Sequence, residues 1–293
     1  MIENRQVYLA DGRRLGYVEC GAESGAPVIY FHGIPGSGRE AQLLEAAARA
    51  RGLRVIAPDR PGYGRSERNP SGSLTSWAQD VAQLAGTLGV DRFAVLGVSG
   101  GAPYALACAW QLADRVTAAA LVCALGPMDS SDALRDMAWP ERFMLTSARC
   151  RPGLVRCVVG MLAWWIRRNP EGFLIGIARM APAPDRAVLQ RPLVRTVLAR
   201  SMEESVRGGT AGVLSDLRTY TRPWGFDVRD LDLPLQLWHG ERDRTVPVQA
   251  ARRLARRLPR SRFHVLDGEG HYSLPLNHMG AILDGLAPAS QRI

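Results

Sequence analysis

Apolar and polar residues follow two different periods along the first part of the chain. Short apolar runs have the length expected of strands buried on both faces, and they lie at 27–32, 53–58, 93–98 and 117–125. Residues 6–21 read as a hairpin with Asp11-Gly12 at its turn. Helical spacing fills the intervals at 40–51, 74–88 and 103–112. Strand and helix therefore alternate, which predicts an α/β protein with a mostly parallel sheet covered on both faces.

This alternation stops after residue 126 and resumes near residue 223. The intervening segment, 127–222, reads as helical, contains no clear strand and is interrupted by prolines. Beyond it, strands are expected at 235–238 and 263–266, and helices at 248–258 and 278–286. We therefore predict an α/β core formed by 1–126 and 223–293, with 127–222 inserted as a helical cap.

The basic residues are all arginines, 37 in number, and the chain contains no lysine. A lysine Schiff base, a Walker A loop and a Ser-Lys dyad are therefore excluded. Compositional bias explains the choice of arginine but not its distribution. Residues 128–222 hold 15 arginines against 9 acidic residues, which is two-thirds of the net charge of +9. We hypothesise that the field of the cap favours an anionic substrate or contacts a partner.

The location is expected to be cytoplasmic. The N-terminus lacks the basic and apolar regions of a secretory signal. Residues 93–113 are uncharged and long enough to span a bilayer, but Ser99-Gly100-Gly101 and Pro103 divide them into strand, turn and helix, so no membrane span is expected. Scattered cysteines without metal-ligand spacing suit buried thiols in a reducing compartment: Cys20, Cys108, Cys123, Cys150 and Cys157.

The strongest chemical signal is the pentapeptide Gly97-Val98-Ser99-Gly100-Gly101. It follows a buried strand and precedes a helix. A serine on such a turn takes strained backbone angles, which lift its hydroxyl above the carboxyl edge of the sheet. We predict that Ser99 is a nucleophile.

A serine nucleophile requires a base, and five histidines are candidates. His271 lies in the glycine-rich loop after the last predicted strand, which a parallel sheet brings over the serine. The other four suit structural positions: His32, His239, His264 and His278. We therefore predict that His271 is the base.

The acid that orients this histidine is expected at Asp243, which follows a strand at the same sheet edge. Glu241 and Asp129 remain acidic alternatives. The chain order Ser99, Asp243, His271 is that of the α/β-hydrolases.

A loop that supplies backbone donors for an oxyanion follows the strand at 27–32. It reads His32-Gly-Ile-Pro-Gly-Ser-Gly38, and the N–H groups of Ile34 and Gly100 are the expected pair. The alternative is an ordinary glycine-rich connection between strand and helix.

Taken together, these motifs resemble the α/β-hydrolase fold superfamily, in the capped branch of small esterases, haloperoxidase-like and proline iminopeptidase-like enzymes. The resemblance spans nearly the whole chain and rests on HGIPGSG at 32–38, DRPGYGRSE at 59–67, GVSGG at 97–101, HGERDRTVP at 239–247 and GEGHYS at 268–273. It implies an eight-stranded sheet flanked by helices, no catalytic role for Asp59 or Arg60, and no metal or organic cofactor. The serine differs from the aspartate nucleophile of epoxide hydrolases and haloalkane dehalogenases.

The expected reaction is hydrolysis of a small carboxylic ester through an acyl-enzyme. Amidase or aminopeptidase-like, carbon–carbon bond hydrolase and haloperoxidase-type chemistry remain alternatives on the same residues, as does a non-catalytic binding or sensor protein.

The aromatic residues of the cap mostly read as the core between its helices, with some of them lining an apolar pocket. A membrane-facing lid is a third interpretation. Candidates for the pocket are Trp139, Phe143, Trp164 and Trp165. Basic residues at 252–257 mark an amphipathic outer helix, and no nucleic-acid-binding motif accompanies them. The oligomeric state does not follow from the sequence.

Overall fold

A single eight-stranded sheet forms the centre of the structure, a computed structural model that describes residues 3–128, 131–135 and 137–288. The strand order is β1-β2-β4-β3-β5-β6-β7-β8. The pairs β1–β2 and β2–β4 are antiparallel and the remaining pairs are parallel, as the sequence predicts. The strands are β1 (Asn4–Tyr8), β2 (Arg14–Gly21), β3 (Ala26–Phe31), β4 (Leu53–Pro58), β5 (Phe93–Val98), β6 (Val116–Val122), β7 (Leu235–Gly240) and β8 (Ser261–Leu266).

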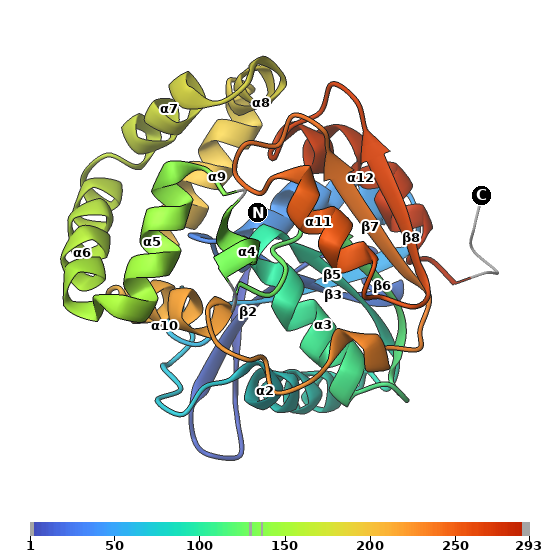
Figure 1. The fold of residues 1–293 in the computed structure, drawn as a ribbon. Helices are drawn as coiled ribbons and strands as arrows, with labels where there is room; N and C mark the ends of the chain where they lie inside the picture. The colour runs from blue at the N-terminus through green and yellow to red at the C-terminus, as the bar shows by residue number, and fades with distance from the viewer. Residues whose placement is uncertain (1–2, 129–130, 136, 289–293) are drawn as a thin grey trace.

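Helices cover both faces of this sheet (Figure 1). One face packs against α2 (Leu74–Thr87), α3 (Ala102–Gln111) and α11 (Val248–Ala255). The other packs against α1 (Glu45–Arg49) and α12 (Ser273–Asp284). The helix expected at 40–51 is instead a 3₁₀ turn, η1 (Gly38–Leu44), followed by α1. Short 3₁₀ turns, η2 (Ser99–Gly101) and η3 (Val228–Asp230), complete the core.

Between β6 and β7 the described residues form helices and connecting segments, as predicted for the insertion. They lie to one side of the sheet in Figure 1, beyond the carboxyl ends of its parallel strands. The helices are α4 (Ser131–Arg135), α5 (Trp139–Cys150), α6 (Pro152–Arg168), α7 (Pro170–Met180), α8 (Ala183–Leu189), α9 (Pro192–Ser205) and α10 (Ala211–Tyr220).

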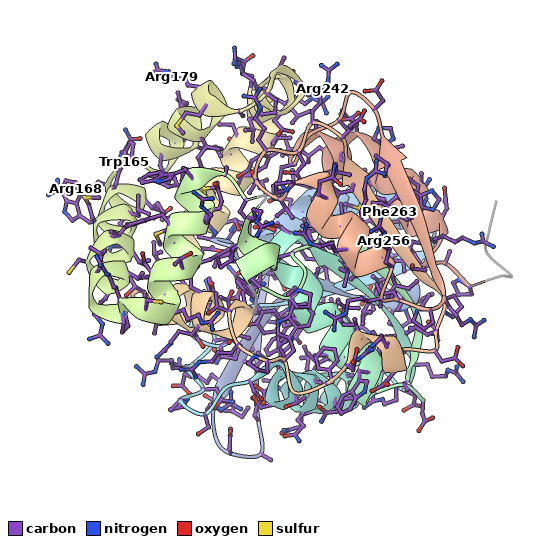
Figure 2. All side chains as sticks on the ribbon, in the orientation of Figure 1. Trp165, Arg168, Arg179, Arg242, Arg256 and Phe263 are labelled. Atoms are coloured by element: carbon purple, nitrogen blue, oxygen red, sulfur yellow. The ribbon has the colours of Figure 1, made fainter. Side chains whose placement is uncertain are left out.

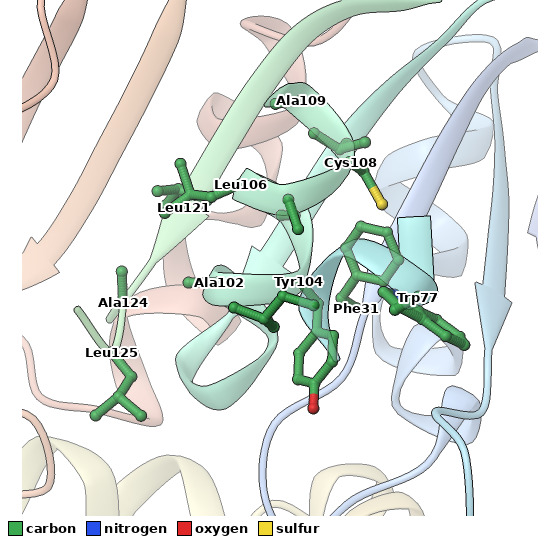
Figure 3. Packing of buried hydrophobic residues seen from close by; sticks show 14 of the residues in the cluster. Phe31, Trp77, Ala102, Tyr104, Leu106, Cys108, Ala109, Leu121, Ala124 and Leu125 are labelled. Carbon is green, nitrogen blue, oxygen red and sulfur yellow. The ribbon is translucent and has the colours of Figure 1, made fainter. Parts of the chain in front are cut away.

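The hydrophobic core between the sheet and helices α2 and α3 is closely packed. Figure 3 shows Phe31 of β3 and Trp77 of α2 beside α3, whose small residues let it approach the sheet. The rings of Phe31 and Trp77 meet edge to face with centroids 6.1 Å apart. This packing fixes the N-terminus of α3 directly after β5, which places Ser99.

Two sequence expectations outside the site can be compared with the structure. Residues 93–113 divide into β5, a turn and α3, and no described helix is long and apolar enough to cross a membrane. The expectation of buried thiols is wrong for two of the five cysteines, because Cys150 and Cys157 are exposed on cap helices.

Candidate active site

The backbone at Ser99 is strained as the sequence predicts. Its φ angle is 54°, a left-handed conformation that costs a non-glycine residue about 1–3 kcal/mol. Ser99 follows the last residue of β5 and opens the 3₁₀ turn that leads into α3. The strain turns the side chain out of the strand direction and presents the hydroxyl at the carboxyl edge of the sheet.

Hydrogen bonds place His271 between this serine and Asp243. The Nε2 atom of His271 lies 3.0 Å from Ser99 Oγ, and its Nδ1 lies 2.8 Å from Asp243 Oδ2. Burial lowers the pKa of His271, but the Asp243 carboxylate and its hydrogen bond outweigh burial and leave the pKa raised above its usual value. Burial raises the pKa of Asp243, and the facing imidazole outweighs it and leaves the pKa lowered. The pair therefore favours an ionised acid beside a basic imidazole.

The Asp243 carboxylate is held in place by its own turn. Its Oδ1 accepts the backbone N–H groups of Thr245 at 2.9 Å and Val246 at 2.8 Å. Of the acidic alternatives, Glu241 is exposed to solvent, and Asp129 lies outside the described residues. Among the candidates that the structure describes, Asp243 is the acid brought to His271.

The other histidines occupy different surroundings. His32 Nε2 accepts the Arg60 N–H at 3.2 Å, and His264 stacks on Trp238 in β7 with ring centroids 4.1 Å apart. His278 Nε2 lies 2.9 Å from Glu269 Oε1. His239 is the nearest to the site, with Nε2 3.3 Å from Asp243 Oδ2 and 2.7 Å from Val246 O. This contact with the Asp243 carboxylate suits a role in supporting the acid.

The two expected oxyanion donors belong to residues that approach each other closely beside the serine. A Cβ atom built on Gly100 would come within 2.9 Å of Ile34 Cγ2 and 2.5 Å of Tyr220 Oη, so only glycine allows this approach. The carbonyl of Gly33 shares a peptide group with the Ile34 N–H, and it accepts a hydrogen bond from Arg60 Nη2 at 3.0 Å. The Arg60 guanidinium thus fixes the plane of that amide.

A buried carboxylate of the cap, Asp216 in α10, holds this arginine, and the sequence analysis missed it. Asp216 Oδ2 lies 2.7 Å from Arg60 Nη2 and accepts from Tyr63 Oη at 2.8 Å, while Oδ1 accepts from Tyr104 Oη at 2.5 Å. The Tyr220 hydroxyl lies 3.0 Å from Asp216 Oδ2 and 2.9 Å from the Gly100 carbonyl. Asp216 therefore connects the cap to both sides of the expected oxyanion site.

A second cap carboxylate, Asp185 in α8, supports the loop of the histidine. Its oxygens accept the backbone N–H groups of His271 at 3.0 Å, Tyr272 at 2.9 Å and Ser273 at 2.8 Å. A Cβ atom on Gly270 would lie 2.4 Å from Asp185 Oδ2, which explains the glycine before the histidine. Neither Asp185 nor Asp216 lies in a recognisable sequence motif. Each bonds to residues that are far away in the sequence, so no local pattern marks its role.

Two cavities meet at the serine. The larger, about 340 Å³, lies between the core and α5, α6, α7 and α10, and the smaller, about 80 Å³, lies over η1 and the start of α12. Both are lined by Ile34, Pro35, Ser99 and Tyr272. The larger cavity is mostly apolar and falls within the size range of small-molecule sites.

The cap aromatics proposed from the sequence do not line this cavity. Trp139, Trp164 and Trp165 are 68%, 58% and 44% exposed, and Phe143 stacks on Trp139. Figure 2 shows Trp165 at the outer edge of the cap. For Trp164 and Trp165 the prediction is wrong because α6 is apolar on several sides, and its aliphatic residues, not its tryptophans, turn inward. The aromatic residues of the cavity wall are Phe173, Tyr220 and Tyr272.

The charge of the cavity wall differs from that of the cap surface. Among the described residues, no arginine lines either cavity. Glu141 of α5 is the carboxylate in the larger one, and its Oε2 is buried with no hydrogen-bond partner in the described part of the chain. Burial raises the pKa of Glu141. The positive charge of the cap therefore does not reach the described wall of the site.

One group of residues has the donor types of a metal site. Potential ligand atoms of Cys123, Asp243 and His271 lie within 4.8 Å of one another. Both His271 nitrogens and Asp243 Oδ2 already take part in the hydrogen-bonded line to Ser99. A metal there would compete with that line, and the donor set therefore fits proton transfer better.

Comparison with known proteins identifies the family of the chain. The sequence profile of the alpha/beta hydrolase family matches residues 28–284, which is most of the chain. The chain belongs to this family. Its members include hydrolases, so an enzymatic role follows at that level.

Individual relatives have several different activities. The chain is 27% identical to a non-heme chloroperoxidase of Burkholderia pyrrocinia, over 91% of this chain and 92% of that protein. It is 26% identical to a 2-hydroxymuconate semialdehyde hydrolase of Pseudomonas putida, over 90% and 86%. A bromoperoxidase structure from Bacillus anthracis superposes with a TM-score of 0.72 at 20% identity, covering 96% and 97% of the two chains, and shows the shared fold.

Proposed function

We propose that the protein is a serine hydrolase that cleaves small carboxylic esters through an acyl-enzyme. The observation that carries the proposal is the hydrogen-bonded line from Ser99 Oγ through His271 to Asp243, at the point where the two cavities meet. An ionised acid, a basic imidazole and a strained serine are the parts that acyl transfer requires.

In the proposed reaction, His271 Nε2 takes the proton of Ser99 Oγ as the oxygen attacks the ester carbonyl carbon. The carbonyl electrons move to the oxygen, and the N–H groups of Ile34 and Gly100 stabilise the resulting oxyanion. When the carbonyl re-forms, the alcohol leaves with the proton from His271. Water then attacks the acyl-enzyme, with His271 again accepting the proton. The bond between the acyl carbon and Ser99 Oγ breaks, the oxygen takes this proton back from His271, and the acid is released.

The cavity wall gives the substrate its proposed character. An apolar cavity of about 340 Å³ suits a short acyl or aryl group. The earlier hypothesis of an anionic substrate finds no arginine among the described lining residues. The carboxylate of Glu141, whose Oε2 has no hydrogen-bond partner in the described part of the chain, instead favours a neutral or amine-bearing substrate over an anionic one.

A labelling experiment with a fluorophosphonate probe tests the nucleophile. We expect the wild type to be labelled and the Ser99→Ala variant to remain unlabelled. Labelling of neither protein, or of both equally, would contradict a serine enzyme and favour a binding or sensor protein. Label on a second reactive serine is distinguished by mass spectrometry of the tryptic peptide that contains residue 99.

The reaction type is tested with p-nitrophenyl esters of increasing acyl length. Each methylene buried in the apolar cavity contributes about 0.8 kcal/mol, or about fourfold in kcat/KM, until the cavity is full. Background rates for every ester, with normal labelling of Ser99, would overturn the ester assignment.

Carbon–carbon bond hydrolysis is the second candidate, because the 2-hydroxymuconate semialdehyde hydrolase relative spans most of the chain. Turnover of 2-hydroxymuconate semialdehyde by untreated enzyme whose Ser99 reacts with the probe, with no ester turnover, would select this reaction.

A further inference from the structure

Large apolar side chains gather on the outer surface of the cap. Of the nine large hydrophobic residues that are exposed in the described chain, eight fall between residues 139 and 193. They are Trp139, Leu154, Met161, Trp164, Trp165, Ile175, Met180 and Leu193. The residues of this group on α6 and α7 do not line either cavity, so the proposed chemistry leaves them unexplained.

On α6 these residues form a continuous outer face. Leu154, Met161, Trp164 and Trp165 follow the spacing of three, four and seven that places side chains on one side of a helix. They are 40%, 63%, 58% and 44% exposed, whereas Val155, Val159, Ala163 and Ile166 are buried on the inner side. The helix is therefore apolar both toward the cap interior and toward solvent.

Positive charge accompanies this face. Helix α6 carries no acidic residue, and Arg168 lies four positions after Trp164, on the same side of the helix, whereas Arg156 and Arg167 lie on its other sides. On α7, Arg179 lies four positions after Ile175. The Arg168 guanidinium lies 5.5 Å from the centre of the Trp164 ring, so cation and aromatic share one surface. Figure 2 places Trp165, Arg168 and Arg179 along the outer edge of the cap, away from Arg256 and Phe263.

This combination of charge and apolar surface selects among possible occupants. A second copy of the chain, packed α6 against α6, would bring the arginines of both copies together without acidic partners on that helix. An anionic bilayer instead accepts the apolar face among its acyl chains and pairs the arginines with its headgroups, while tryptophan suits the boundary between them.

We propose that the outer face of α6 and α7 docks the protein on a membrane surface rich in anionic phospholipid. The face is defined as Leu154, Met161, Trp164, Trp165, Arg168, Ile175, Arg179 and Met180. Docking is peripheral, because only the solvent-facing apolar side chains would enter the lipid and no described helix is long and apolar enough to cross it. The cavity that reaches Ser99 is lined in part by the inner sides of these same helices, so the proposal places two helices of the cavity wall against the lipid.

The experiment is co-sedimentation with vesicles of phosphatidylcholine alone and of phosphatidylcholine with 30% phosphatidylglycerol, at about 0.05 and 0.5 M salt. We expect binding to the anionic vesicles that weakens at high salt. Met161→Ser/Trp164→Ser removes apolar surface, and it should reduce binding at least about tenfold. Arg168→Gln/Arg179→Gln removes two exposed cationic side chains from this face, with a similar effect.

A matched control removes two arginines elsewhere. Arg252→Gln/Arg256→Gln changes the net charge equally on α11, and both side chains are exposed. It should bind within about twofold of the wild type. All three variants should keep the melting temperature of the wild type, because their side chains are exposed.

Three results would overturn the proposal. The first is the absence of binding to anionic vesicles at low salt. The second is an equal loss of binding in the α11 control, which would assign the effect to net charge. The third is a dimer in light scattering that Met161→Ser/Trp164→Ser dissociates, which would assign the face to a second copy. None of these results depends on whether the enzyme hydrolyses esters.

Discussion

Replacement of Asp185 by asparagine should impair catalysis from a residue that belongs to the cap. The carboxylate of Asp185 accepts three consecutive backbone N–H groups at His271, Tyr272 and Ser273, and the residue is 1% exposed. Asparagine keeps one acceptor oxygen and places an NH₂ group against the remaining donor. In Asp185→Asn, at least one backbone N–H is therefore left buried without a partner.

The magnitude follows from this loss. An unsatisfied buried donor costs about 1–3 kcal/mol. An unfolding entropy of about 2.1 cal/mol/K per residue gives about 0.6 kcal/mol/K for 293 residues, so the melting temperature should fall by about 2–5 °C. A displaced imidazole should lower kcat by about 10- to 100-fold, whereas KM should change little because Asp185 lines neither cavity.

The pH profile provides a readout that a purely structural role would not move. Burial lowers the pKa of His271, while Asp243 and, to a smaller extent, Asp185 raise it. Removal of one negative charge destabilises the imidazolium, so its pKa falls. Because the neutral imidazole is the base, the acidic limb of kcat/KM should shift to lower pH.

The assay combines thermal denaturation with kcat and KM from pH 5 to 9. Glu171→Gln is the matched control, because it removes a cap carboxylate that is exposed and forms only a surface ion pair with Arg195. Wild-type kcat and an unmoved acidic limb in Asp185→Asn, despite a lower melting temperature, would refute the positioning role.

Three further changes test the remaining parts of the site. Asp216→Leu leaves the Arg60 charge buried without its partner, so the free energy of unfolding should fall by about 3–5 kcal/mol in denaturant titration. The double variant Arg60→Met/Asp216→Leu should recover part of this free energy without recovering kcat. Asp243→Asn should lower kcat by about 10⁴, while Glu241→Gln stays within about twofold, and the reverse order would contradict the assignment of the acid. Glu141→Gln should lower kcat/KM for p-nitrophenyl 4-(aminomethyl)benzoate relative to the 4-ethylbenzoate, and an unchanged ratio would show that this carboxylate does not contact the amine.

The α/β architecture was predictable because its signals are local. An apolar run, a glycine-flanked serine and a helix that begins directly afterwards define β5, Ser99 and α3 without any long-range information. The positions of Asp243 and His271 followed from one topological rule, that carboxyl ends of parallel strands share an edge. The loops after β5, β7 and β8 bring Ser99 and Asp243 within hydrogen-bond distance of His271.

The cap was less predictable, because the orientation of its helices depends on tertiary packing. Apolar residues occupy several sides of α6, so periodicity does not identify the inner face, and large aromatics were assigned to the pocket although Ala163 and Ile166 face inward. The roles of Asp185 and Asp216 were also beyond the sequence, since each carboxylate bonds to groups more than 85 positions away.

The hydrogen bonds of Asp185 and Asp216 to the core also bear on how this protein can be altered by recombination. A chimera that exchanges residues 127–222 for the insertion of a relative would remove the acceptor of the histidine loop and the counter-ion of the arginine beneath the oxyanion loop. The core of the chimera would retain Ser99, Asp243 and His271. The inserted segment would need carboxylates at positions equivalent to Asp185 and Asp216 to keep these residues in place. The insertion therefore contains two parts with different roles. Its outer helices α5–α7 can be exchanged without loss of either carboxylate, whereas α8 and α10 carry the carboxylates and belong to the catalytic framework.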